Sequence, residues 1–155
     1  MVMIHLPGRR GAPPPQIDPS TGTVTTWSPY SNLRILQILE RSIQLLRGLR
    51  NARCDSCFRR LPGGRSFTEV FDDPTVFISF DPTSPFRGTT DWVGGREITI
   101  GHREFEGNPR IMFSTVASTI LHELAHVNGA PETNAQAENT LRCCGMSRLF
   151  TGVTG

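Results

Sequence analysis

The stretch STVASTILHELAHVN, residues 114–128, constrains the fold most, because it has to form a helix with two histidines on one side. Ser114 can cap the start of this helix, and Asn128 followed by glycine is a helix-stopping pair. Four residues along an α-helix turn a side chain by only about 40° and raise it by about 6 Å. His122 and His126 therefore point the same way from successive turns and can bind one metal ion.

The surroundings of these histidines are apolar, as the run TILHELAHV shows. The leucines and the valine in this run would anchor the helix in a core, where two histidines and a glutamate without a ligand would be costly to bury. The alternative is a chance match of a short pattern on an ordinary surface helix. The apolar setting favours a metal site with His122 and His126 as ligands.

Glu123 directly follows the first histidine, so its carboxylate lies to the side of the metal, where it can take a proton from a bound water. With this H-E-x-x-H pattern, the segment 114–145 resembles the zincin metallopeptidases. The resemblance implies a small zincin-like domain, one Zn²⁺ ion, and hydrolysis of peptide bonds through a zinc-activated water. In that mechanism Glu123 is the general base.

Two histidines do not complete a catalytic zinc site, and the resemblance offers two glutamates as third ligand. In the gluzincin group this ligand is a glutamate of the next helix, which corresponds to Glu138. In the metzincin group, with the pattern HExxHxxGxxH, it follows a glycine turn, and Glu132 stands there. If two antiparallel helices meet at Gly129, Glu138 returns to the height of His122, whereas Glu132 stays at the tip. We favour Glu138 and keep Glu132 as the alternative.

The function expected from the resemblance is that of a zinc-dependent metalloendopeptidase with a protein or peptide substrate. The alternative is a non-catalytic binding module that zinc only stabilises. A catalytic zinc keeps an open coordination position, whereas a structural zinc site is closed. Glu123 favours catalysis, because a structural site needs no carboxylate there. His102 could contact the substrate, although a solvent-facing strand histidine is the simpler interpretation.

The remaining patterns predict an α+β fold in which an N-terminal helix, the helix with the two histidines and a further helix pack on a short, mainly antiparallel sheet. Residues 31–51 carry apolar side chains at helical spacing and predict a helix capped by Ser31. Residues 52–74 have no clear period and predict irregular structure. The last helix should start at Pro131 or Thr133.

Two stretches have the pattern of strands. Residues 75–80, TVFISF, predict a buried strand, closed by an aspartate and a proline. Residues 96–105 alternate between apolar and polar side chains and predict a strand with one exposed face. We expect this second strand to run along the cleft, where an extended peptide could add to it as another strand.

The chain has 155 residues, which corresponds to a single folded domain by size. Residues 7–30 contain six of the 12 prolines, with serine, threonine and glycine between them. Such a composition favours an extended segment without a helix of its own. We therefore divide the chain into a flexible Pro-rich arm, residues 1–30, and the zincin-like domain, residues 31–155.

The formal net charge of +2 is too small to indicate a nucleic-acid partner, and no apolar run is long enough to indicate a membrane span. The start MVMIHLPGRRG lacks the charge order of a secretory signal. All 16 cationic residues are arginines. A GC-rich genome would explain the lack of lysine, and so would selection against lysines as ubiquitination targets in a host cell. We expect a cytoplasmic protein, or a toxin or effector domain exported without a signal peptide by a carrier or secretion partner.

The four cysteines are arranged as Cys54-x-x-Cys57 and the adjacent pair Cys143-Cys144. A structural zinc site usually needs two C-x-x-C units, and adjacent cysteines diverge, so both pairs are disfavoured as zinc ligands. We expect disulfides between the middle of the chain and its end. Buried free thiols and a redox-active C-x-x-C are the alternatives.

Overall fold

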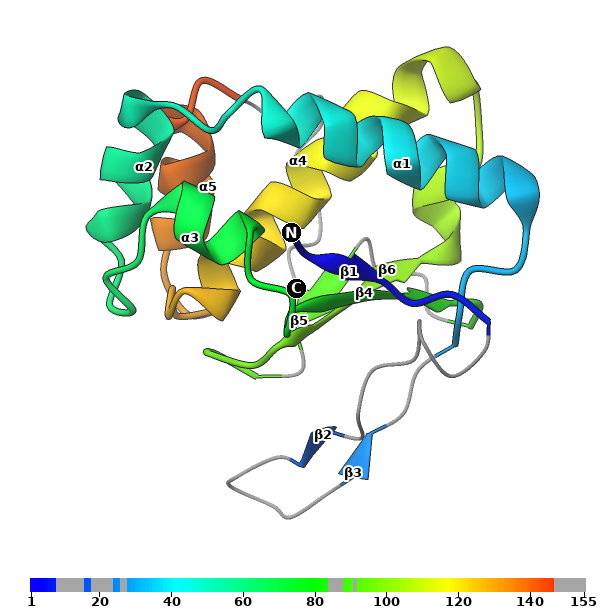
Figure 1. The fold of residues 1–155 in the computed structure, drawn as a ribbon, viewed down its shortest axis with the longest axis horizontal. Coiled ribbons are helices and arrows are strands. Elements are labelled where there is room, and N and C mark those ends of the chain that lie inside the picture. Colours follow the sequence, from blue (N-terminus) through cyan, green and yellow to red (C-terminus); the bar gives the residue numbers. More distant parts are fainter. Residues whose placement is uncertain (8–15, 18–23, 26–27, 84–87, 91, 147–155) are drawn as a thin grey trace.

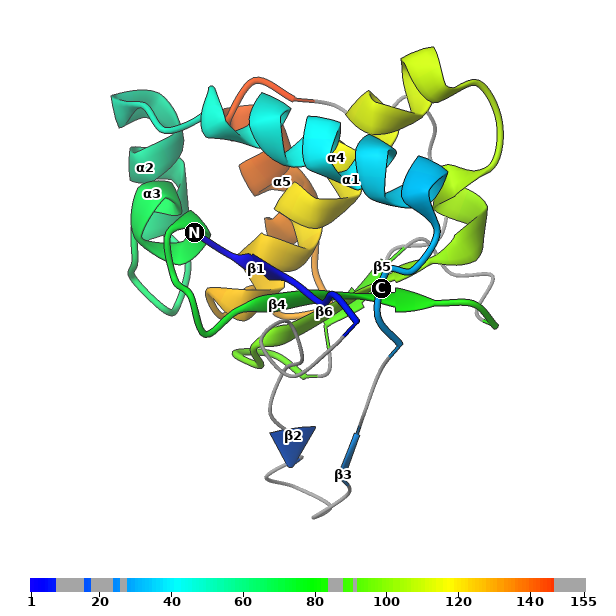
Figure 2. The ribbon, with the colours of Figure 1, turned by 45° about the vertical axis from the view of Figure 1, so that its right-hand side comes forward.

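A four-stranded sheet carries the helices on one of its faces (Figure 1 and Figure 2). The computed structural model describes residues 1–7, 16–17, 24–25, 28–83, 88–90 and 92–146. The sheet consists of β1 (Met3–Ile4), β4 (Phe77–Asp81), β5 (Gly88–Thr90) and β6 (Glu97–Gly101). A separate antiparallel pair, β2 (Gln16–Ile17) and β3 (Val24–Thr25), lies on the side away from the helices. The predicted α+β fold class is confirmed.

The strand order in the sheet is β1-β4-β6-β5. The pairings of β1 with β4 and of β4 with β6 are parallel, and β5 runs antiparallel to β6. The prediction of a mainly antiparallel sheet is therefore wrong. In a sequence, a parallel pair of strands is usually recognised by a predicted helix between them. Here the chain passes from β4 through the edge strand β5 to β6, and that signature is missing from the sequence.

The strand β6 is an inner strand, because β4 pairs with one of its edges and β5 with the other. All five of its residues are buried. The residues that follow form the 3-10 helix η1 (His102–Phe105) and do not continue the strand. The expected strand 96–105 is thus shorter than predicted, has no exposed face, and offers no free edge to a peptide.

The helix α1 (Leu33–Arg47) lies within the predicted range 31–51 and packs against α4 (Pro109–Val127). Its N-cap is Asn32 and not Ser31, since the Asn32 side chain accepts a hydrogen bond from the backbone N–H of Ile35 at 3.1 Å. Such a cap satisfies one of the backbone donors that the first turn leaves without a helical partner. The predicted broad apolar face is the face that meets α4.

The helix α4 begins at Pro109, earlier than the predicted Ser114. Asn108 caps it by accepting the N–H of Arg110 at 3.0 Å, and a proline suits the first helical position because its missing N–H would have no partner there. The predicted stop is confirmed, with Asn128 as C-cap. Among the described residues, no helix is both long and apolar enough to cross a membrane.

Three shorter helices complete the layer: α2 (Ala52–Arg59), α3 (Phe67–Phe71) and α5 (Gln136–Cys143). The irregular structure expected for residues 52–74 is therefore wrong. Asn51 caps α2, and Ser66 forms a capping box with Glu69 at the start of α3. The last helix starts later than Pro131 or Thr133, which leaves a longer turn after α4.

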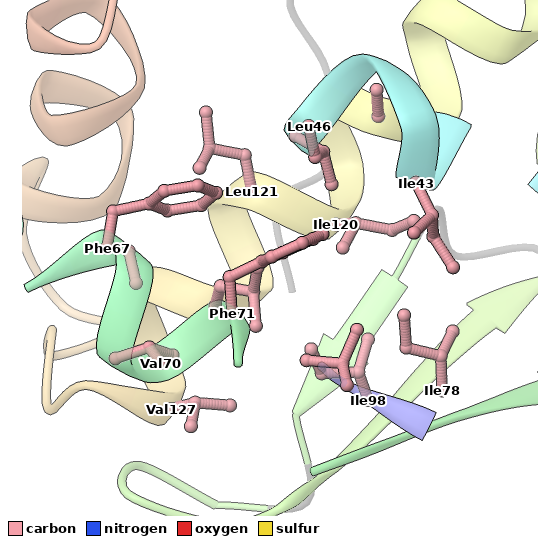
Figure 3. Close-up of a cluster of buried hydrophobic side chains, with 14 of the residues drawn as sticks. Ile43, Leu46, Phe67, Val70, Phe71, Ile78, Ile98, Ile120, Leu121 and Val127 are labelled. Atoms are coloured by element: carbon pink, nitrogen blue, oxygen red, sulfur yellow. The ribbon is translucent and has the colours of Figure 1, made fainter. Parts of the chain in front are cut away.

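The apolar core lies between the helices and the sheet (Figure 3). Side chains from three helices and two strands meet there, and each of them is at most 3% exposed: Ile43, Leu46, Phe67, Phe71, Ile78, Ile98, Ile120 and Leu121. Because α4 supplies its middle turns to this core, the turn that follows, with both histidines, is held in a fixed position.

The N-terminal residues belong to the sheet. Val2 is buried, β1 pairs with β4, and His5 lies with its Nδ1 atom 3.0 Å from Ser79 Oγ. Tyr30 is also buried and donates from its hydroxyl to the Ser79 carbonyl at 3.0 Å. Burial lowers the pKa of His5 and raises that of Tyr30 well above its usual value. The predicted arm, residues 1–30, is therefore too long at both ends, and most of its centre lies outside the described residues.

Two disulfides connect α2 to the end of α5. Cys54 is bonded to Cys144, and Cys57 to Cys143. The predicted link between the middle of the chain and its end is confirmed, and the cysteines are not available as metal ligands. The two bonds lie side by side, since each joins positions close in sequence to those of the other.

Removing both disulfides is expected to destabilise the fold much more than removing either one alone. Each closes a loop of about 90 residues, but once one is present the other closes only a small additional ring. Replacing one cystine by serines should therefore cost about 2 kcal/mol, and replacing both should cost more than about 4 kcal/mol, in the chain-entropy description. Urea unfolding measures the difference. Four reactive thiols in the unfolded, unreduced protein would contradict the pairing.

Candidate metal centre

The two predicted histidines lie next to each other on the last turns of α4. His122 Nε2 and His126 Nε2 are 3.1 Å apart, and the rings meet at an interplanar angle of 75°. The side chains are 3% and 2% exposed. Their spacing on the helix and the packing of α4 against the sheet and α1 together produce this convergence.

The second ring nitrogen of each histidine has an oxygen partner. His126 Nδ1 lies 2.7 Å from the carbonyl oxygen of Ala130, and His122 Nδ1 lies 2.8 Å from Oε1 of Glu138. The Ala130 carbonyl reaches His126 because Gly129 turns the chain with a φ of +92°, a conformation that glycine adopts without strain. The stop of the helix therefore also orients the second histidine.

The donor set fits a metal ion. A carbonyl oxygen can only accept, so Nδ1 of His126 carries the proton and Nε2 of the neutral ring presents a lone pair. The two Nε2 atoms are 3.1 Å apart, and whether His122 donates to His126 depends on the tautomer of His122. Two nitrogens on one tetrahedral Zn²⁺ ion lie about 3.3 Å apart, from metal–nitrogen distances of about 2.0–2.1 Å.

Glu123 completes a group of three converging side chains. One ligand atom from each of His122, Glu123 and His126 lies within 4.8 Å of the others. Glu123 is fully buried, and its Oε2 accepts a hydrogen bond of 2.7 Å from the Thr90 hydroxyl on β5. The strand can approach so closely because Gly88 has no side chain: a Cβ there would lie 2.6 Å from Thr119 Cγ2.

The other residues that the sequence suggested for the site are Glu138, Glu132 and His102. Glu138 is near this group, with its Oε1 atom 2.8 Å from Nδ1 of His122, and its role as third ligand remains a prediction. Glu132 is exposed, in the turn before α5. His102 lies on η1, where its Nδ1 is 3.0 Å from Glu106 Oε1.

Sequence reasoning missed the polar residues that surround the helix. Thr90 belongs to a three-residue strand that no pattern predicts. Glu104, on η1, accepts a hydrogen bond of 2.7 Å from Thr119, one turn before Glu123. The signal that could have found them is weak: a buried helix with polar residues at Thr119 and Glu123 needs partners from other elements.

The end of α4 is fixed to the loop between α2 and α3. The Asn128 side chain donates to the carbonyls of Phe58 and Arg65, both at 2.9 Å, and its backbone carbonyl accepts from Gly63 at 2.8 Å. A Cβ on Gly63 would lie only 2.6 Å from that carbonyl oxygen. In addition, the N–H of Gly94 donates to the carbonyl of His126 at 2.9 Å. The C-terminal end of α4, which carries both histidines, is thus held from two sides.

Gly63→Ala is therefore expected to destabilise the protein by about 1–3 kcal/mol, the usual cost of overpacking. The clash is with the Asn128 side-chain oxygen, which its hydrogen bonds hold in place, and with the Asn128 backbone carbonyl, which cannot rotate away. Gly48→Ala is the matched control, because its Cβ would meet Leu45 O at 3.3 Å and nothing closer. Equal unfolding midpoints in urea for both variants would contradict the tight contact at Asn128.

In the comparisons with known proteins, no family model matches this chain, and no curated protein or solved structure matches it. Support for the metal centre therefore comes from its own geometry: two imidazole nitrogens that converge from successive turns of α4, with the His126 ring oriented by the Ala130 carbonyl and with Glu123 beside them.

Proposed function

We propose that this protein is a zinc-dependent metalloendopeptidase. The observation that carries the proposal is the facing pair of Nε2 atoms of His122 and His126, 3.1 Å apart, with the carboxylate of Glu123 in the same group. Imidazole nitrogens suit Zn²⁺ among the common divalent ions. A carboxylate next to such a pair is the arrangement that metal-assisted hydrolysis uses.

The roles of the residues follow from their positions. His122 and His126 would hold the ion through Nε2, and bound zinc would polarise the scissile carbonyl and make the attacking water more acidic. Glu123 would take the proton of that water and pass it to the leaving amine. Thr90 would keep the Glu123 carboxylate turned towards the histidines, since its hydroxyl donates to Oε2.

The substrate would approach along β5. This strand is at the edge of the sheet, and in the described part of the chain no other strand pairs with its outer side. It also lies against α4 at Glu123. An extended peptide that added to β5 by backbone hydrogen bonds would pass close to the metal ligands. We therefore propose that the peptide adds to β5, and not to the inner strand β6 as the sequence suggested.

A non-catalytic, zinc-stabilised module is the second candidate, and burial favours it. The side chains of His122, Glu123 and His126 are 3%, 0% and 2% exposed, whereas a catalytic centre has to admit a peptide. The two candidates differ in whether a small ligand can reach the metal. Acetohydroxamate added to the Co²⁺-loaded protein should change its visible spectrum if a coordination position is open, and leave it unchanged if the site is closed.

The two disulfides bear on where the protein works. Disulfides form and persist in oxidising compartments and are rare in the cytosol. Two of them join α2 to α5 here. Of the two locations that the sequence left open, export from the cell is thus the better supported one, and the substrate would be a protein or peptide outside the producing cell.

Glu123→Gln is the direct test of catalysis. The amide keeps the shape of the side chain but cannot take a proton, so zinc content should persist while peptide hydrolysis falls by at least about a hundredfold. His126→Ala, in contrast, should lose both zinc and activity. Cleavage should be followed across a whole proteome, because a narrow substrate range would escape a single test protein. If wild type and Glu123→Gln leave identical peptide patterns, the non-catalytic module is the better description.

Thr90→Val should lower activity by about tenfold or more. A hydrogen bond to a charged group is worth about 1.5–3 kcal/mol, and each 1.4 kcal/mol of transition-state stabilisation is about tenfold in rate. Valine keeps the volume of threonine but removes the donor to Glu123. Thr90→Ser, which retains the hydroxyl, is the control and should stay close to wild type. Equal losses in both variants would show that the effect is not specific to the hydrogen bond, because Thr90→Ser retains the hydroxyl.

A further inference from the structure

We infer that Cys143 is a modification site for a small thiol that carries a carboxylate. The modification opens the Cys57–Cys143 disulfide and leaves the Cys54–Cys144 disulfide closed. The inference goes beyond the proposed function and does not depend on the metal site. It rests on a cavity between α2 and α5, two helices that lie side by side (Figure 1), because one of the two disulfides lines this cavity.

The two disulfides differ in their access to solvent. Cys54 and Cys144 are 0% and 5% exposed, and neither lines the cavity. Cys57 is 4% exposed, but Cys143 is partly exposed, and both of them line the cavity. Thiol–disulfide exchange requires that a thiolate reach one of the two sulfurs. Cys143 therefore offers the sulfur that a thiol from solvent can attack.

The other residues that line the cavity suit an anion. The cavity has a volume of about 260 Å³, the share of roughly nine water molecules in the liquid, which suffices for a small organic thiol. Arg60, directly after α2, is the only charged residue among the described residues that line it, and Gln136 and Asn139 contribute amide groups from α5. Within the described ranges, Arg60 has no carboxylate partner. Guanidinium and amide N–H groups are donors that a carboxylate accepts from.

The modification exchanges one disulfide for another. The thiolate of the small molecule attacks Cys143 Sγ, and a new S–S bond forms as the bond to Cys57 breaks. Cys57 leaves as a thiolate and takes a proton from water. The number of disulfide bonds stays the same, so this step needs no oxidant or reductant. The step is reversible, because the Cys57 thiolate can attack the mixed disulfide and expel the small thiol.

The modified protein is expected to keep its fold. The Cys54–Cys144 disulfide still joins α2 to α5, and the buried side chains of Ala137 and Leu141 anchor α5 in the core. Opening one bond replaces a double covalent link between the two helices by a single link. The modification therefore gives α5 more freedom relative to α2 without releasing it.

The first test treats the full chain, folded and oxidised, with reduced glutathione, blocks free thiols with an alkylating reagent, and maps the cysteines by mass spectrometry. We expect glutathione on Cys143, the alkyl group on Cys57, and an intact bond between Cys54 and Cys144. Replacing Cys54 and Cys144 by serines should leave the rate of modification unchanged, whereas the protein with serines at 57 and 143 should resist it. Glutathione first on any other cysteine, or simultaneous loss of both disulfides, would overturn the inference.

The second test asks whether the cavity recognises the carboxylate. Mercaptoacetate and the uncharged mercaptoethanol are compared, each relative to its own rate with a small uncharged disulfide. Arg60→Gln should slow mercaptoacetate by about fivefold at low salt, the effect of one opposite charge at contact distance in water, and leave mercaptoethanol unchanged. Arg59→Gln is the matched control, because Arg59 is also exposed but does not line the cavity, and it should change neither rate. If Arg60→Gln slows both thiols equally, or Arg59→Gln acts like Arg60→Gln, the carboxylate is not recognised in this cavity and the inference fails.

Discussion

Two histidines and a glutamate in the apolar interior between the helices and the sheet are costly to bury, and much of the surrounding structure supplies the partners that offset this cost. Thr90 reaches Glu123 from the edge strand, the Ala130 carbonyl reaches His126 from the turn after α4, and Glu138 reaches His122 from α5. These partners come from three different elements. The centre therefore depends on the whole arrangement of β5, α4 and α5, and any change that moves one of them against the others weakens it.

The sequence was informative where a local pattern is strong. The apolar period around His122 and His126 predicts α4, and the Asn128-Gly129 pair predicts its end. It was uninformative where structure depends on distant partners. The strand that carries Thr90 is three residues long and gains its place by pairing with β6. In the same way, α2 is short and mixed in composition, and its cap at Asn51 and its disulfides to α5 hold it in place.

The third-ligand question shows the same limit at the level of single atoms. Helix geometry correctly brings Glu138 back to the height of His122, since the two side chains are in contact. Spacing along a helix cannot say which nitrogen of the ring the carboxylate will meet. That depends on the rotation of the imidazole, which the other contacts at the site determine.

The disulfides connect the stability of the fold to the geometry of the site. They attach the end of α5 to α2, and the loop after α2 in turn holds Asn128 through backbone and side-chain hydrogen bonds. Both ends of the turn between α4 and α5 are therefore fixed to the same part of the molecule. The turn contains the Ala130 carbonyl, and α5 contains Glu138, so the residues that contact the two histidines through Nδ1 are held by this one unit. The two disulfides, which join cysteines 90 and 86 residues apart in sequence, thereby hold α5 and the turn before it against the end of α4.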